Sequence, residues 1–143
     1  MKFYKVTTKH TQFEINEIIL NMTTAEVEYI KELYDSLSIV EYTDSDGFEC
    51  MYAILNDVYL SRILDTYESY SLKYKISDIT KDVINDDIEI NYKNEFGKSV
   101  RVEIVNLIKK FKKKYVSKDD ILDKILEKGM NSLSKEDLKI LKS

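Results

Sequence analysis

A chain of 143 residues, 43% of them hydrophobic and 34% charged, has the size of one globular domain, or of one small domain with an appendage. A single cysteine excludes an internal disulfide, and a single histidine leaves no cluster of histidines and cysteines for a metal. No apolar run approaches the ~20 residues that cross a bilayer, and the first residues lack the apolar core of a signal peptide. We therefore expect a cytoplasmic or virion protein without membrane insertion.

The charges are divided unevenly along the chain. Residues 1–98 hold 10 basic and 19 acidic side chains, a net charge of −9, whereas residues 99–143 hold 12 and 7, a net charge of +5. This division predicts an acidic domain (1–98), a basic amphipathic helix (99–116) and a C-terminal helix-turn-helix appendage (117–143). A basic tail on an acidic body can bind its own body, a neighbouring protein or a polyanion.

The first elements are a strand and a helix. Phe3, Tyr4 and Val6 indicate a strand, although residues 13–20 compete for that role, and a hairpin of both with a loop at 7–12 is an alternative. Thr23 and Glu26 then form a capping box that opens a helix. Its apolar face consists of Val27, Ile30, Leu33, Tyr34 and Leu37.

A hairpin, a helix and a strand follow. Residues 39–43 and 48–55 flank a turn that ends in Gly47, and the second of these strands is apolar on both faces, as a central strand is. Asp57 is expected to cap a helix, after which residues 72–76 alternate as a strand. The order strand, helix, hairpin, helix, strand predicts an α+β fold: a ferredoxin-like (split βαβ) sheet with helices on one face.

The next stretch allows two interpretations. After a short helix at 78–84, residues 88–92 alternate as a strand and residues 94–98 read as a turn. Residues 100–104 could then continue as a strand that closes a hairpin. We favour a helix over 99–116, because one helical series runs through it without a break: Val100, Ile104, Leu107, Ile108, Phe111 and Tyr115.

The C-terminal stretch predicts a helical hairpin. Ser117 with Asp120, and Ser134 with Asp137, have the spacing of capped helix starts. Gly129 is expected at a left-handed C-terminal position between the two helices. Helices this short are marginal in water by themselves, so the hairpin must dock on something. Its two apolar stripes are Ile121, Leu122, Ile125 and Leu126, and Leu138 and Leu141.

Residues 117–143 resemble a short C-terminal module of unknown function that ends many proteins of Bacteroidetes bacteria, including some rhomboid-type proteases. In that module an Ile-Leu-Asp-Lys-Ile helix, a Gly, a Ser-Leu-(Ser/Thr) turn and a charged helix follow one another. The resemblance implies an origin in Bacteroidetes or their phages and a docking role. It transfers no catalytic residue, and this chain has no Gly-x-Ser-x-Gly motif.

Two acidic clusters could suggest a metal. In the loop that ends at Gly47, the EF-hand template puts Tyr42 and Ala53 at ligand positions that they cannot fill, so we expect a simple turn. Asp86, Asp87 and Glu89 could hold a divalent cation, but no further acid or lysine at a suitable spacing completes such a site. A solvated strand face is the favoured interpretation.

Two further residues are candidates for catalysis. His10 lies in a polar loop with no nucleophile nearby, and it reads as an ordinary surface histidine. Cys50, in the expected central strand, reads as a small core residue. We therefore expect no enzyme, no cofactor, no metal and no small-molecule substrate.

The strongest candidate for a functional region is the basic helix. With Phe111 buried, its lysines should spread over a broad cationic surface that could bind an acidic protein or phosphates. We expect a non-enzymatic interaction, structural or assembly protein, for instance a small phage virion or host-directed component, that binds a protein partner or itself. A nucleic-acid-binding regulator is the alternative. The predicted partner-binding residues are Lys109, Lys110, Lys112, Lys113, Lys114, Ile121, Leu122, Ile125, Leu138 and Leu141.

Overall fold

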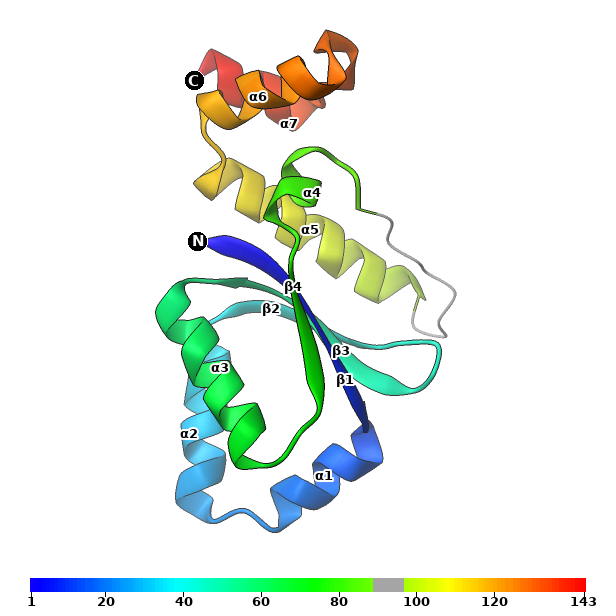
Figure 1. The fold of residues 1–143 in the computed structure, drawn as a ribbon, viewed down its shortest axis with the longest axis vertical. Coiled ribbons are helices and arrows are strands. Elements are labelled where there is room, and N and C mark those ends of the chain that lie inside the picture. Colours follow the sequence, from blue (N-terminus) through cyan, green and yellow to red (C-terminus); the bar gives the residue numbers. More distant parts are fainter. Residues whose placement is uncertain (89–96) are drawn as a thin grey trace.

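The computed structural model describes residues 1–88 and 97–143, which form an α+β fold around one antiparallel sheet (Figure 1). The first elements in chain order are β1 (Lys2–Thr11), α1 (Gln12–Leu20), α2 (Thr24–Asp35), β2 (Ser38–Thr43), β3 (Phe48–Leu55) and α3 (Asp57–Ser69). They are followed by β4 (Tyr74–Asp78), α4 (Thr80–Ile84), α5 (Gly97–Tyr115), α6 (Lys118–Lys128), a 3-10 turn η1 (Met130–Ser132) and α7 (Lys135–Lys142).

The strand order is β2-β3-β1-β4, and every neighbouring pair is antiparallel. In the register, Lys2 lies opposite Leu55 of β3, and Tyr4 lies opposite Asp78 of β4. Residues 50–55 of β3 are all buried, because helices cover both faces of the sheet. The prediction of a central strand with two apolar faces is therefore confirmed.

Each face of the sheet has its own hydrophobic core. On one face, α2 and α3 contribute Leu33, Ile63 and Tyr67 to a cluster with residues of β1 and β3. On the opposite face, α5 packs Ile104, Leu107 and Phe111 against side chains that include Phe3, whose ring meets that of Phe111 edge-on at 5.5 Å. Figure 1 shows α5 on one side of the sheet and α2 with α3 on the other.

The helical interpretation of residues 99–116 is confirmed, and the alternative of a strand at 100–104 is wrong. The residues with helical spacing lie on one stripe of α5 and pack in the core between the helix and the sheet. The predicted strand at 88–92 and turn at 94–98 fall almost entirely on residues 89–96, outside the described part of the chain. α5 itself begins at Gly97.

Residues 13–20 form helix α1, so the prediction of a strand there, and of a hairpin with β1, is wrong. Both edges of β1 are already paired, one with β3 and one with β4, which leaves no edge for residues 13–20. Thr11 also starts a helix at this point, because its side chain accepts a hydrogen bond from the backbone N–H of Glu14 at 3.3 Å.

The helix starts agree closely with the sequence signals. The capping boxes of Thr23 with Glu26, Ser117 with Asp120 and Ser134 with Asp137 are all present. The prediction for α3 is wrong by one residue: Asn56, not Asp57, is the cap, and its Oδ1 accepts a hydrogen bond from Tyr59 N at 2.9 Å. Gly47 and Gly129 both have a φ of +83°, as their turns require.

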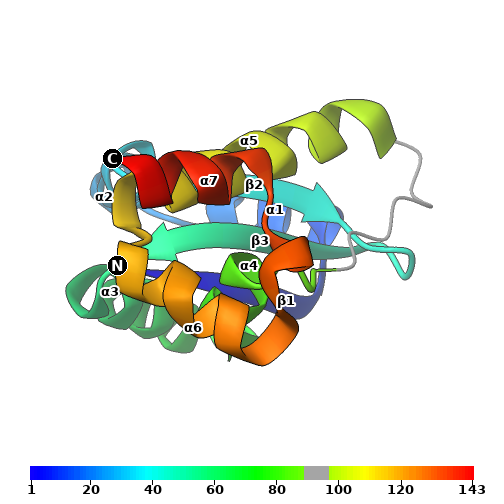
Figure 2. The same cartoon turned by 90° about the horizontal axis from the view of Figure 1, so that it is seen from above.

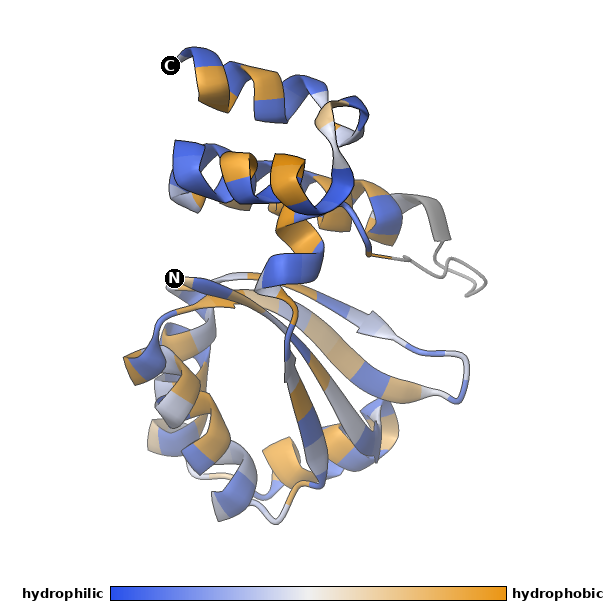
Figure 3. Ribbon diagram, turned by 45° about the horizontal axis from the view of Figure 1, so that its top comes forward, coloured by the Kyte–Doolittle hydropathy of each residue, from blue (hydrophilic) through white to orange (hydrophobic). Residues whose placement is uncertain are grey.

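The C-terminal hairpin docks on the outer side of α5 and beside α4, as Figure 2 shows from above. Ile121 is completely buried in the core that α5 shares with the sheet, and Val116 at the end of the linker is buried beside it. In Figure 3 hydrophobic and hydrophilic residues alternate along α6 and α7, as expected for helices that pack on one face. One continuous core therefore joins the sheet, α5 and the hairpin.

Candidate interaction surface

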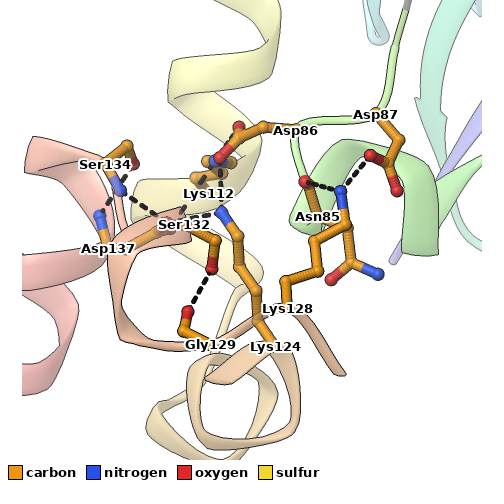
Figure 4. Close-up of polar contacts among 10 residues, drawn as sticks. All are labelled: Asn85, Asp86, Asp87, Lys112, Lys124, Lys128, Gly129, Ser132, Ser134 and Asp137. Carbon is orange, nitrogen blue, oxygen red and sulfur yellow. Dashed lines mark hydrogen bonds and ion pairs between the residues drawn. The ribbon is translucent and has the colours of Figure 1, made fainter. Parts of the chain in front are cut away.

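Four charged side chains meet where α5, α6 and α7 approach the segment after α4 (Figure 4). Lys124 Nζ of α6 donates a hydrogen bond to Asp137 Oδ2 of α7 at 2.6 Å and another to Asp86 Oδ2. Lys112 Nζ of α5 donates to Asp86 Oδ1 and lies 3.6 Å from Asp137 Oδ1. Two ammonium groups and two carboxylates thus form a neutral cluster of Asp86, Lys112, Lys124 and Asp137, which we call the ionic clasp.

Three members of the ionic clasp are buried. Lys112 is 3% exposed, Lys124 is 1% exposed and Asp137 is 0% exposed, while Asp86 forms the side open to solvent. Removing an ion from water costs several kcal/mol, which only well-placed partners offset. Each lysine faces both aspartates, so the low-energy arrangement is the one in which α5, α6 and α7 keep these positions.

Asp137 has two structural roles at once. Its Oδ2 accepts a hydrogen bond from the backbone N–H of Ser134 at 3.0 Å, as part of the predicted capping box. The same carboxylate binds Lys124 in the ionic clasp. Burial would raise the pKa of Asp137, but the hydrogen bonds from Lys124 and Ser134 and the charge of Lys112 outweigh burial and hold its pKa below the usual value.

A second layer of polar contacts surrounds the ionic clasp. Lys128 Nζ pairs with Asp87 and donates to the backbone carbonyl of Asn85 at 3.1 Å. Lys81 Nζ of α4 lies 2.8 Å from Glu127 Oε1 of α6. These contacts attach α6 to α4 and to the segment that follows it, at the rim of the buried cluster.

Asp86 and Asp87 both pair with lysine side chains. Asp86, at a φ of +57°, directs its carboxylate into the ionic clasp, and Asp87 pairs with Lys128. Glu89, the third acid of the suggested cluster, lies outside the described residues. In the described part of the chain, no group of three or more histidine, cysteine, aspartate or glutamate side chains is placed to hold a metal ion.

The sequence predicted that all five lysines of residues 109–114 lie on one solvent-facing surface, but only four of them do. Lys112 points into the protein and belongs to the ionic clasp, so this part of the prediction is wrong. The helix turns its side chains by 100° per residue, and position 112 therefore faces α6 and α7. The other four lysines are exposed: Lys109, Lys110, Lys113 and Lys114. Lys110 Nζ among them donates to Ser38 Oγ at 2.6 Å.

The hairpin brings three more lysines close to those of α5. Lys135, Lys139 and Lys142 lie on the outer face of α7, one or two turns apart, and all three are exposed. Because α7 packs directly against α5, the two rows of lysines belong to one end of the molecule. None of the exposed lysines of the two helices forms an ion pair within residues 1–88 and 97–143. We call this set the cationic surface: Lys109, Lys110, Lys113, Lys114, Lys135, Lys139 and Lys142.

The apolar residues predicted to bind a partner divide into two groups. Ile121 is fully buried, and Ile125 and Leu141 pack against the same core, so these three fix the hairpin in place and are not available to a partner. Leu122 and Leu138 remain 50% and 41% exposed. The predicted apolar stripe of α6 is thus partly internal and partly exposed.

The loop of residues 44–47 is a turn, as predicted. Asp44 Oδ1 accepts hydrogen bonds from the backbone N–H groups of Asp46 and Phe48, both at 2.9 Å. Aspartate side chains commonly stabilise tight turns by accepting hydrogen bonds from the backbone of their own loop. The carboxylate oxygen is thereby engaged by the backbone of its own loop.

The two candidate catalytic residues, His10 and Cys50, are engaged in the packing and hydrogen bonding of the fold. His10 Nδ1 lies 3.0 Å from Glu14 Oε2, and its Nε2 accepts a hydrogen bond from Lys73 N at 2.7 Å, so the ring connects α1 to the start of β4. Cys50 is 4% exposed, and burial, followed by the charge of Asp44, raises the pKa of its thiol to about 11. A protonated, buried thiol is a poor nucleophile.

Comparisons of the chain with protein-family models, with curated proteins and with solved structures found no match. Among the helices that the structure describes, none is long and apolar enough to span a bilayer.

Proposed function

We propose that the protein is a non-enzymatic interaction and assembly protein, whose cationic surface binds an acidic protein surface. One observation carries the proposal: two adjacent helices, α5 and α7, present rows of exposed lysines without acidic partners in the described chain. Surface lysines are usually interspersed with acids, and an uncompensated field of one sign favours partners of the opposite sign.

The rigidity of the helices that present these lysines supports the same proposal. The ionic clasp and the side chain of Ile121 fix α7 against α5, so the spacing of the two rows is set before a partner arrives. A preorganised surface loses less conformational entropy on binding than a flexible tail does. This favours a defined partner surface over diffuse attraction.

The charges of the chain point to a second copy as the occupant. Residues 1–98 carry a net charge of −9, and the cationic surface belongs to residues 99–143, with a net charge of +5. Exposed acids of α2 and α3, such as Glu28, Glu32 and Asp65, lie on the side of the sheet opposite α5. Contact between unlike surfaces of two copies is heterologous, and such contacts build rings or filaments.

Sedimentation velocity of the full chain tests this proposal. We expect larger species at about 20 mM salt that dissociate at about 500 mM, because surface charge pairs are screened within a few ångströms at high salt. Changing Lys109, Lys113 and Lys139 to Gln should abolish association. Changing Lys9, Lys73 and Lys75 to Gln, which removes the same charge from the sheet region, should leave it intact. A monomer at all salt concentrations would contradict self-assembly.

A nucleic acid is the second candidate partner, because the exposed lysines of the neighbouring helices α5 and α7, Lys109, Lys113 and Lys139 among them, would also suit phosphates. The acidic body opposes a long polyanion, so we rank this candidate lower. A salt titration of a fluorescent duplex and a single strand decides it. Binding that has a steep salt dependence, and that the triple change of these lysines to Gln weakens, would favour nucleic acid over protein.

For the body we propose the split βαβ (ferredoxin-like) arrangement. The strand order β2-β3-β1-β4 and its antiparallel pairing support it, as does the position of α2 and α3 on one face of the sheet. Helix α1 would then be an insertion between β1 and α2, and α5 an addition on the second face.

A further inference from the structure

A cavity of about 400 Å³ lies between α1, the face of the sheet that carries α2 and α3, and the ends of those two helices. Val6 and Met51 form its floor from the sheet, and Ile15, Ile18 and Ile30 line it from α1 and α2. Its size and largely apolar walls are those of small-molecule sites, which typically measure about 300–1,000 Å³.

Helix α1 forms one wall of this cavity. Its residues Ile15, Ile18 and Ile19 recur on one face and line the cavity, yet α1, which the structure describes in full, has no buried residue. In Figure 1, α1 crosses from the end of β1 toward the start of α2 and so bridges the sheet and the helix layer. An apolar helix face gains stability only when something covers it, and here the space in front of it is large enough for a ligand.

Polar groups are concentrated at one part of the cavity wall. Tyr67 is 8% exposed, and its hydroxyl lies 3.5 Å from the Tyr34 hydroxyl, which is too long for a good hydrogen bond between hydroxyls. The Glu41 carboxylate also lines the cavity; burial is the main cause that raises the pKa of both phenols, and the charge of Glu41 adds to it. The side-chain carboxylate of Glu41, unlike its backbone, which pairs with Met51 in the sheet, forms no hydrogen bond or ion pair with any residue in the described part of the chain.

The charge around the cavity is negative. One lysine, Lys31, lines it together with three acids, Asp35 of α2, Glu41 of β2 and Glu49 of β3. Glu41 as a whole is exposed to solvent, and the partial desolvation of its carboxyl, followed by the charge of Glu49, raises its pKa. A cationic group placed beside Glu41 would remove this penalty, and it could also donate a hydrogen bond to the Tyr67 hydroxyl.

We propose that this cavity binds a small molecule with an apolar body and one protonated amine. The apolar body covers the isoleucines of α1, and the ammonium group lies between Glu41 and Tyr67. The sequence indicated no small-molecule ligand, because the cavity walls come from six elements that are distant along the chain. The site does not depend on the cationic surface, which lies on the other face of the sheet.

Binding of three probes of equal chain length tests the proposal: n-octylamine, n-octanol and n-octanoate, each titrated into the full chain at neutral pH below its micelle concentration. We expect saturable binding of n-octylamine, with n-octanol at least about tenfold weaker, as the loss of one charge-assisted hydrogen bond implies. The octanoate should bind weakest, because its charge has the same sign as Glu41.

Two pairs of variants separate this site from adsorption to the acidic surface. Glu41→Gln should weaken n-octylamine binding about tenfold, whereas Glu28→Gln, which removes the same charge from the exposed side of α2, should not. Ile15→Trp should fill the cavity and abolish binding, whereas Val58→Trp on the exposed side of α3 should not. The comparison of the two glutamine variants stands even if the tryptophan variants do not fold.

Two kinds of binding result would contradict the proposed amine site. Absence of saturable binding for all three probes would overturn the site. Equal affinities for the three probes, or equal weakening by Glu41→Gln and Glu28→Gln, would overturn the assignment of an amine.

Discussion

Lys124 and Asp137 form a hydrogen-bonded ion pair of 2.6 Å between α6 and α7, and neither side chain reaches solvent. The pair joins the two helices of the C-terminal hairpin from within, and through Lys112 and Asp86 it also joins them to α5 and to the segment after α4. The orientation of the hairpin, and with it the cationic surface, depends on this contact.

Asp137→Ala should destabilise the protein by about 3–5 kcal/mol, because it leaves Lys124 buried without its closest counter-charge. Urea unfolding followed by circular dichroism measures the change. Glu136→Ala on the same helix is the control, and we expect less than about 1 kcal/mol from it. A loss below about 1 kcal/mol for Asp137→Ala would mean that Lys124 finds water or another partner.

Replacing the pair as a whole should be milder than breaking it. In Lys124→Met with Asp137→Leu, no charge is left unpaired, and buried ion pairs are often no more stable than apolar side chains of similar volume. We therefore expect the double variant to be more stable than Asp137→Ala in the same urea experiment. Equal stability of the two would show that the capping role of Asp137 dominates.

Stability should fall in acid, in part because of Asp137. The pKa of this carboxyl is lower in the folded protein than in the unfolded chain, so the unfolded chain binds the proton first as the pH falls. The Asp137 carboxylate contributes fully to the free energy of unfolding above its pKa in the unfolded chain, which is about 4. This contribution is lost as the pH falls toward its lower pKa in the folded protein. Urea midpoints between pH 7 and pH 2 should drop less steeply in Asp137→Asn than in the natural chain.

Truncation of two neighbouring residues on α6 should lower the stability of the protein by very different amounts. Ile121→Ala should cost about 2–5 kcal/mol, because it opens a cavity in the core that joins the hairpin to α5. Leu122→Ala, at a half-exposed position, should cost less than about 1 kcal/mol. Similar losses at both positions, measured by thermal unfolding, would contradict the docked orientation of α6.

Cys50 should react with a thiol reagent only after unfolding. Burial and a pKa of about 11 keep its thiol inaccessible and protonated at neutral pH. Labelling with Ellman's reagent should therefore be slow in buffer and rapid in concentrated urea. Rapid labelling of the folded protein would show that the edge strand β2 separates readily from β3.

Local signals were sufficient for most elements. The capping boxes at Thr23, Ser117 and Ser134, the turn at Gly47 and the helical series of α5 were all predictable, because each depends on residues within a few positions of one another. The overall α+β character followed from their order. The error at residues 13–20 was of a different kind, since only the pairing of both edges of β1 excludes a strand there.

The sequence by itself determined the starts of α2, α6 and α7 and the turn at Gly47, the division of charge between body and tail, and the need of the C-terminal hairpin to dock. The tertiary structure alone decided that Lys112 and Lys124 are internal, since their neighbours Phe111 and Ile125 place them beside a packed face, and the acids that neutralise them come from elsewhere in the chain. The same holds for the cavity under α1. Partners that are distant in sequence meet only when the chain folds, and a periodic pattern carries no information about which of them will meet.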